Sequence, residues 1–148
     1  MDNVLEIERL SKTLGNFHLH EVSFALPRGY VMGFIGPNGA GKTTTIKLVM
    51  NLMHRDSGEV RVFGLDNCSY GKEIKQRIGF VYDDSHYYQN LSILENRRTV
   101  ARFYRGWDEK AFQRHLLDFG LPPDKKLKDL SRGMRTKFSL AIALSHGA

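Results

Sequence analysis

The sequence contains a single cysteine, Cys68, among its 148 residues. One cysteine cannot form an intramolecular disulfide, which indicates a reducing compartment or a thiol without a structural role. No stretch approaches the roughly 18 to 20 consecutive apolar residues that a membrane-spanning helix needs. Residues 1–6 also lack the basic-then-apolar order of a signal peptide. We therefore expect a soluble, cytoplasmic chain in which any membrane role is exerted through a partner.

Patterns typical of metal sites, internal repeats and low-complexity segments are absent as well. The six histidines are scattered without the spacing of metal ligands, so zinc is not expected. A hydrophobic content of 41% is enough for a globular core and excludes disorder. The formal charge of +6 suits an anionic partner, but charge alone does not define a fold, and nucleic acid is a minor alternative here.

Short apolar stretches in the first half of the chain predict β-strands. Residues 4–10 and 22–26 alternate between apolar and polar side chains, as half-buried strands do. Residues 30–35 are continuously apolar, which is typical of a strand covered on both faces in a parallel sheet. Residues 60–63 and 78–82 are two further strand candidates. Two strands are thus expected before any helix.

Helical signals appear at residues 42–53 and dominate from about residue 85 onward. The second group contains three predicted helices, whose N-caps would be Ser92, Asp108 and Ser131. Ser92 and Glu95 have the spacing of a capping box. The chain is therefore expected to consist of a mixed lobe followed by a helical lobe.

A phosphate-binding pattern, G-x-x-x-x-G-K-[ST], lies between the predicted strand at 30–35 and the helix that follows. Its glycines allow backbone N–H groups to approach a phosphate, and the helix start adds a positive dipole end. Lys42 is expected to reach the β and γ phosphates, Thr43 to ligate Mg²⁺ and Thr44 to contact the α phosphate. The candidate nucleotide-binding residues are Gly36, Asn38, Gly39, Ala40, Gly41, Lys42, Thr43 and Thr44.

A second candidate anion site lies at the start of the last predicted helix, in the segment Leu130-Ser131-Arg132-Gly133-Met134. Ser131 is a good N-cap, and Gly133 keeps the first turn free of a side chain. A free helix N-terminus of this kind attracts anions. A plain helix cap would explain the segment equally well if it stood without the phosphate loop.

Together, the segments 36–45 and 130–134 resemble those of the ATP-binding subunit (nucleotide-binding domain) of an ABC transporter. The resemblance implies an α/β fold, with a P-loop NTPase core, an N-terminal antiparallel β portion and an α-helical subdomain. Residues 1–84 would form the β-rich ATP-binding lobe and residues 85–148 the helical signature subdomain of one domain. It also implies ATP and Mg²⁺ as ligands, membrane-spanning partner subunits, and a head-to-tail homodimer or heterodimer. Its location would be cytoplasmic, peripheral at the inner face of the cell membrane, with no nucleic acid partner.

The family signature usually reads L-S-G-G-Q, and it closes over the γ phosphate of ATP held by the opposite subunit. Ser131 and Gly133 match the signature and carry over as ATP-binding candidates. Arg132 and Met134 depart from the common Gly and Gln. The arginine would add positive charge near the expected phosphate.

Two further positions carry expectations from the resemblance. Asp83 stands where the family has the glutamine of its Q-loop, and its carboxylate would be a second Mg²⁺ ligand beside Thr43. Adenine usually stacks on an aromatic residue after the first strand; the matching position is Leu14, with Phe17 or His18 close enough to substitute, and Phe17 is the candidate here. Packing of Phe17 into the core is an equally open alternative.

In the family, the signature helix is followed by an apolar strand that ends in Asp-Glu, the Walker B part. The sequence ends at Ala148, before such a segment, so the resemblance implies the N-terminal portion of a subunit. We expect weak Mg-ATP binding, no hydrolysis and unpaired strand edges that favour self-association. The alternatives are a soluble ABC-type ATPase acting on nucleic acid or ribosomes, and a non-hydrolysing nucleotide-binding fragment.

Overall fold

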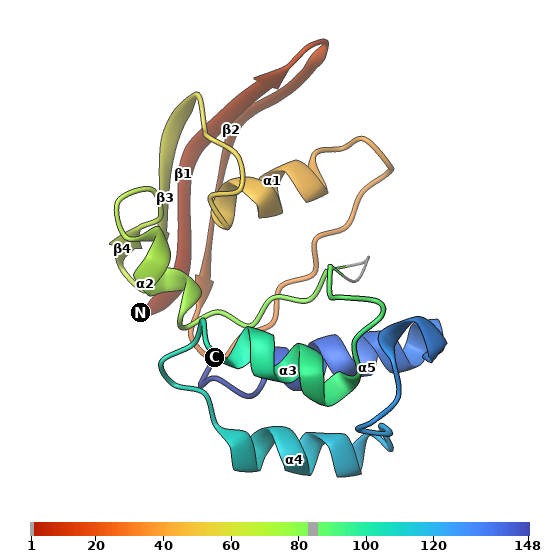
Figure 1. The fold of residues 1–148 in the computed structure, drawn as a ribbon. Helices are drawn as coiled ribbons and strands as arrows, with labels where there is room; N and C mark the ends of the chain where they lie inside the picture. Colours follow the sequence, from red (N-terminus) through yellow and green to blue (C-terminus); the bar gives the residue numbers. More distant parts are fainter. Residues whose placement is uncertain (1, 83–85) are drawn as a thin grey trace. The chain divides into compact units, whose positions relative to one another are not determined.

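The computed structural model describes residues 2–82 and 86–148, drawn as a ribbon in Figure 1. The chain divides into two compact units, residues 1–74 and residues 75–148. The first unit holds the strands and the second holds most of the helices. The chain therefore has the mixed α/β character that the sequence predicts.

The first unit is built on one four-stranded antiparallel sheet in the order β2-β1-β3-β4. Ile7 of β1 and its partner Val60 of β3 lie in its core, as does Leu10, which follows an irregularity in β1 where the register with β2 shifts. The predicted strands at 4–10, 22–26 and 60–63 are confirmed. The strands are β1 (Asn3–Leu14), β2 (Phe17–Pro27), β3 (Ser57–Val62) and β4 (Leu65–Asp66).

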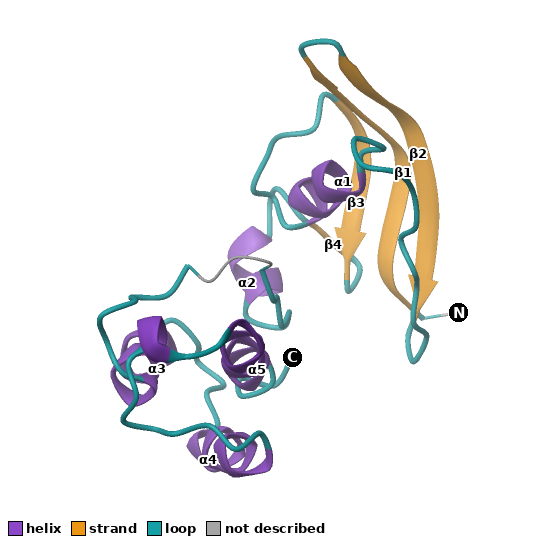
Figure 2. Cartoon of the chain, turned by 90° about the vertical axis from the view of Figure 1, so that its right-hand side faces the viewer, coloured by secondary structure: helices purple, strands orange, loops and turns teal. Residues whose placement is uncertain are grey.

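Two helices accompany the sheet: α1 (Lys42–Val49) and α2 (Gly71–Lys75). Both views place α1 beside the sheet of its own unit (Figures 1 and 2). Leu48 of α1 is buried. The predicted helix at 42–53 is confirmed but ends earlier, at Val49, with Met50 as its C-cap.

The predictions of a parallel-sheet strand at 30–35 and of a further strand at 78–82 are wrong. Neither segment forms a strand, and Figure 1 shows the first as loop between β2 and α1. The side chains of Val31 and Ile35 are 99% and 96% exposed. A strand needs a neighbouring strand to accept its hydrogen bonds, and no described residue bonds to the backbone of residues 31–35.

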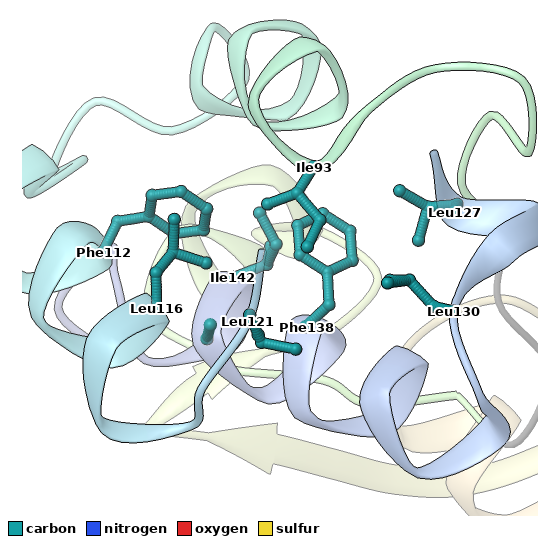
Figure 3. Close-up of a cluster of buried hydrophobic side chains, with 9 residues drawn as sticks. Ile93, Phe112, Leu116, Leu121, Leu127, Leu130, Phe138 and Ile142 are labelled. Atoms are coloured by element: carbon teal, nitrogen blue, oxygen red, sulfur yellow. The ribbon is translucent and has the colours of Figure 1, made fainter. Parts of the chain in front are cut away.

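The second unit packs its helices around a separate apolar core, shown in Figure 3. Phe112 of α4 and Phe138 of α5 lie at its centre, with Ile93 at the start of α3. Within the described residues, no helix is long and apolar enough to cross a membrane. The helices are α3 (Ile93–Ala101), α4 (Glu109–Asp118), the short 3₁₀ turn η1 (Leu127–Asp129) and α5 (Arg132–Ala143).

The three predicted N-caps of this unit are confirmed. Ser92 and Glu95 form a capping box, in which each side chain accepts a hydrogen bond from the other residue's backbone N–H. Asp108 accepts from the N–H of Ala111, and Ser131 accepts from that of Met134. These caps satisfy amides that a helix leaves without partners, so local sequence suffices to fix the helix starts.

Candidate functional site

The loop of residues 36–41 turns tightly into α1 through two glycines with left-handed backbone. Gly39 has φ +83° and Gly41, the N-cap of α1, has φ +92°. The Ala40 N–H donates to the Pro37 carbonyl over 3.2 Å, which closes the turn between them. Residues other than glycine rarely adopt such φ values, so the glycines of the phosphate-binding pattern are required here by the backbone conformation.

The Lys42 side chain folds back over this loop. Its ammonium group donates to the carbonyl oxygens of Gly36 at 2.5 Å and Pro37 at 2.8 Å. Within the described residues Lys42 forms no ion pair with a carboxylate. The cation is thus held at the loop by neutral acceptors, which an anionic ligand can outcompete.

The start of α1 offers backbone N–H donors and has no acidic side chain beside them. The first turn contains no acidic residue, and the first amides of a helix have no intrahelical acceptors. The Thr45 hydroxyl donates to the Gly41 carbonyl over 2.9 Å and is buried, whereas Thr43 is exposed. The loop therefore brings together six of the predicted residues and the positive end of a helix. They are Gly36, Asn38, Gly39, Ala40, Gly41 and Lys42, followed in the first turn by Thr43 and Thr44.

Phe17 lies directly against this loop. A methyl group added at Gly41 would lie 2.9 Å from the Phe17 ring and 3.0 Å from the Leu19 side chain. Phe17 is half-buried, because it also packs at the start of β2. The position of its ring is compatible both with stacking on a base bound at the loop and with packing in the core. The adenine-stacking role of Phe17 therefore stays a prediction.

A buried side chain that the sequence analysis missed supports the far end of α1. The Asn67 amide donates to the carbonyls of Leu48 at 2.7 Å and Val49 at 2.9 Å, and its oxygen accepts from Arg55 at 2.6 Å. Asn67 follows β4 and is separated from α1 by eighteen to nineteen positions. Its only local signal is an asparagine next to a turn, which does not reveal the long-range contact.

The same network holds an acidic group at the surface of the first unit. Asp66 accepts from the Ser69 backbone N–H at 2.9 Å and from Arg55 at 2.7 Å. The Ser69 amide, with Arg55 contributing, lowers the pKa of Asp66 to about 2. This carboxylate is therefore ionised and forms an ion pair with Arg55, which in turn donates to the Asn67 side-chain oxygen.

The second motif lies in the other unit, at the N-terminus of α5. Leu130 is buried and its carbonyl accepts from the Arg135 side chain at 3.2 Å. Ser131, Arg132 and Gly133 are exposed, and no atom lies within 4 Å of the place where a Gly133 side chain would begin. The segment thus presents an open helix start to solvent, with Arg132 beside it.

The predicted Mg²⁺ ligand Asp83 lies outside the described residues, so its role stays a prediction. Among the residues that are described, no group of three His, Cys, Asp or Glu side chains is arranged to hold a metal ion. The candidate ligand on the phosphate loop is then Thr43, a hydroxyl oxygen of the kind that Mg²⁺ accepts when phosphates and water supply the remaining ligands.

Comparison with known proteins identifies the family that these motifs belong to. The ABC transporter family matches residues 19–148. An uncharacterised ABC transporter ATP-binding protein of Bacillus subtilis is 35% identical over 99% of this chain and 49% of its own length. A bacitracin transport ATP-binding protein of Enterococcus faecalis is 30% identical over 99% of this chain and 48% of its own. The chain belongs to the ATP-binding proteins of ABC transporters.

Solved structures agree with this assignment. The ATP-binding subunit of an ABC transporter superposes with a TM-score of 0.83 at 27% identity, covering 94% of this chain and 60% of the other. An ABC transporter ATP-binding protein from Pyrococcus furiosus superposes with a TM-score of 0.81, covering 97% of this chain and 71% of the other. The chain spans about half the length of the curated relatives named above and corresponds to their N-terminal part.

Proposed function

We propose that this chain is the ATP- and Mg²⁺-binding N-terminal portion of a transporter ATPase subunit. The observation that carries the proposal is the loop of residues 36–41 with Lys42 folded over it. Gly39 and Gly41 adopt the left-handed turns, and the helix start and Lys42 supply positive charge to one place. Triphosphate is the ligand class that matches a run of backbone donors beside a single cation.

The residues of the phosphate loop have distinct roles in this proposal. Lys42 exchanges the carbonyls of Gly36 and Pro37 for the β and γ phosphates. Thr43 ligates Mg²⁺, and Thr44 contacts the α phosphate. Bound Mg²⁺ offsets the charge of the phosphate oxygens, and the chain's own contribution is to bind and orient the nucleotide.

Hydrolysis by these 148 residues alone is not part of the proposed function. The attacking water needs a group that orients or activates it. The sequence contains no Asp-Glu pair at the end of an apolar strand, the arrangement that the family uses for this purpose. We therefore expect ATP to bind and remain intact.

The partners that follow from the family are a second ATPase subunit and membrane-spanning subunits. Ser131, Gly133 and Arg132 at the open start of α5 would face the γ phosphate held by the second subunit. Transport coupled to hydrolysis would be a property of that complete assembly.

Equilibrium dialysis with Mg-ATP tests the proposal. Wild type should bind one nucleotide, and Lys42→Ala should bind at least tenfold more weakly, because about 1.5–3 kcal/mol accompanies the loss of a charge-assisted contact. Lys47→Ala, an exposed lysine on the last turn of α1, is the matched control and should bind as wild type does. Equal loss in both variants, or no binding by wild type, would contradict the proposal.

A further inference from the structure

Each strand of the hairpin formed by β1 and β2 (Figure 1) contains a residue other than glycine with left-handed backbone. Arg9 of β1 has φ +45° and Glu21 of β2 has φ +46°. Residues of these types rarely adopt such angles. Both residues are exposed, so packing of their side chains does not explain the strained backbone. Such strain persists only where the surrounding structure holds it.

The two left-handed residues lie in a pair of opposed β-bulges, one in each strand. Two residues of β1 lie between Ile7 and Leu10, opposite one residue of β2. Two residues of β2 lie between Leu19 and Val22, opposite one residue of β1. The second bulge therefore restores the register that the first one shifts.

Each bulge is closed by a serine of the opposite strand. The Arg9 N–H donates to the Ser23 hydroxyl oxygen over 2.8 Å, and the Glu21 N–H donates to that of Ser11 over 3.0 Å. A bulge disrupts the ladder locally, and the two serines supply acceptors at these places. We call Arg9, Ser23, Glu21 and Ser11 the bulge pair.

The third strand of the sheet leaves room for the first bulge. The register of β1 with β3 also shifts between Glu8 and Ser11, where Gly58 is the intervening residue of β3. A side chain at Gly58 would collide with the Arg9 carbonyl group. The first bulge is therefore accommodated by the sheet as a whole and not only by the hairpin.

The bulge in β2 decides which side chains lie on the core face of the hairpin. Phe24 is on this face, because it pairs with a buried residue of β1. Alternation without a bulge would continue this face through residues 22, 20 and 18. The bulge shifts the alternation by one residue, so Leu19 and Phe17 follow instead. Leu19 is buried, as this position requires.

Phe17 and Leu19 both lie against the phosphate loop. A methyl group added at Gly41 would lie 2.9 Å from the Phe17 ring and 3.0 Å from the Leu19 side chain. By alternation His18 lies on the other face, where its ring forms a hydrogen bond of 3.2 Å with the Thr13 hydroxyl. The bulge pair therefore directs a phenyl ring, and not an imidazole, toward the loop.

We propose that the bulge pair is a positioning element of the nucleotide site, which holds Phe17 at the phosphate loop so that its ring covers one side of the bound base. Bulges are common next to active sites, where they redirect a side chain. The proposal rests on the proposed function, but it concerns the base and not the phosphates. The phosphates are assigned to the loop of residues 36–41 and to Lys42, which lie outside the hairpin. Loss of the bulge pair should therefore weaken binding of ATP more than binding of inorganic triphosphate.

Equilibrium dialysis with Mg²⁺ and either ATP or inorganic triphosphate separates the two contributions. Ser11→Ala with Ser23→Ala removes both acceptors and should weaken ATP binding about fivefold, since a stacked base contributes roughly fivefold or more to affinity. Triphosphate binding should change less than twofold. Ser11→Thr with Ser23→Thr keeps both hydroxyl acceptors and should bind both ligands as wild type does. Ser57→Ala, at an exposed position of β3, is the control and should also match wild type.

Phe17→Ala tests whether the two serines act through this ring. It should weaken ATP binding at least as much as the double alanine variant does. Adding both serine-to-alanine substitutions to Phe17→Ala should cause no further loss, because residues that act through one contact are not additive. Additive losses would show that the serines act on the site in another way.

A measurement without nucleotide reports the position of the ring. Phe17 lies against Gly41, so its ring current should shift the nuclear magnetic resonance signal of the nearer Gly41 Hα proton. This shift should shrink in the double alanine variant and remain in the double threonine variant. Circular dichroism checks that each variant is folded at the temperature of measurement.

The proposal is overturned if the double alanine variant binds ATP and triphosphate in the same ratio as wild type, if its Gly41 signal is unchanged, or if its loss adds to that of Phe17→Ala. In each case the bulges only shape the sheet. Wild type that binds neither ligand would contradict the proposed function, and this proposal with it. Binding of both ligands by wild type, with an unchanged ratio in the variant, contradicts the role of the bulge pair alone.

Discussion

Asn67 donates its side-chain amide to the Leu48 carbonyl over 2.7 Å and thereby ties the end of β4 to the last turn of α1. The residue is buried, and its side chain bonds to α1, Arg55 and the neighbouring Cys68 thiol. A helix C-terminus leaves carbonyls without intrahelical donors, and Asn67 supplies two of the missing donors. The orientation of the helix that begins at Lys42 therefore depends on a residue far from the loop itself.

Asn67→Ala should lower the free energy of unfolding by about 2–3 kcal/mol, because it removes the amide hydrogen bonds to the Leu48 and Val49 carbonyls and one acceptor of Arg55. Urea denaturation measures this change. Lys72→Ala, at an exposed position of α2, is the control and should change stability by less than about 0.5 kcal/mol. Equal stabilities of the Asn67 variant and wild type would show that this network does not support α1.

Gly41→Ala should destabilise the first unit and weaken its binding of nucleotide. The φ of +92° costs a non-glycine residue about 1 kcal/mol, and contact with Phe17 at 2.9 Å adds about 1–3 kcal/mol of overpacking. Gly39→Ala is the comparison, because φ is +83° there but no atom lies within 4 Å. Thermal unfolding of both variants should give the larger loss at Gly41, and a larger loss at Gly39 would contradict the packing described here.

His146 should make stability depend on pH. Burial lowers the pKa of His146 from its usual value near 6.5, and this effect outweighs the opposite influence of the Gln76 backbone. Neither ring nitrogen has a hydrogen-bond partner among the described residues. Between the lowered pKa and 6.5, the unfolded chain binds more protons than the folded chain. Stability should therefore fall as the pH drops below 6.5, and the fall should level off below the folded-state pKa.

Urea denaturation at pH 7.5 and pH 5.5 measures this dependence in wild type and in His146→Phe. The phenyl ring retains stacking on Tyr104 and removes the titrating group. The variant should lose less stability than wild type between the two pH values, by at most about 1.4 kcal/mol for each pH unit crossed. Identical losses in the two proteins would assign the pH dependence to other groups.

The sequence predicts those features of the structure that depend on residues close together along the chain. The caps at Ser92, Asp108 and Ser131 and the loop that ends at Lys42 follow from residues a few positions apart, and each is found in the structure. Asn67 was missed because its partners lie on another element.

The strand prediction at 30–35 failed for a related reason. Its residues have the apolar composition of a buried strand, but a strand forms only when a neighbour supplies hydrogen bonds, and none of the described residues does so. Val31 and Ile35 therefore have the apolar composition of a buried strand, but their side chains are exposed in this structure. The prediction that the chain self-associates through such edges stays open to measurement by sedimentation.

Binding of Mg-ATP at the loop of residues 36–41 is the central claim, and nuclear magnetic resonance of the ¹⁵N-labelled chain tests it most directly. Titration with Mg-ATP should shift the backbone amide signals of residues 39–44, because their N–H groups gain phosphate acceptors. The shifts should disappear in Lys42→Ala and persist in Lys47→Ala. Shifts confined to residues 75–148, or unchanged in Lys42→Ala, would contradict the account.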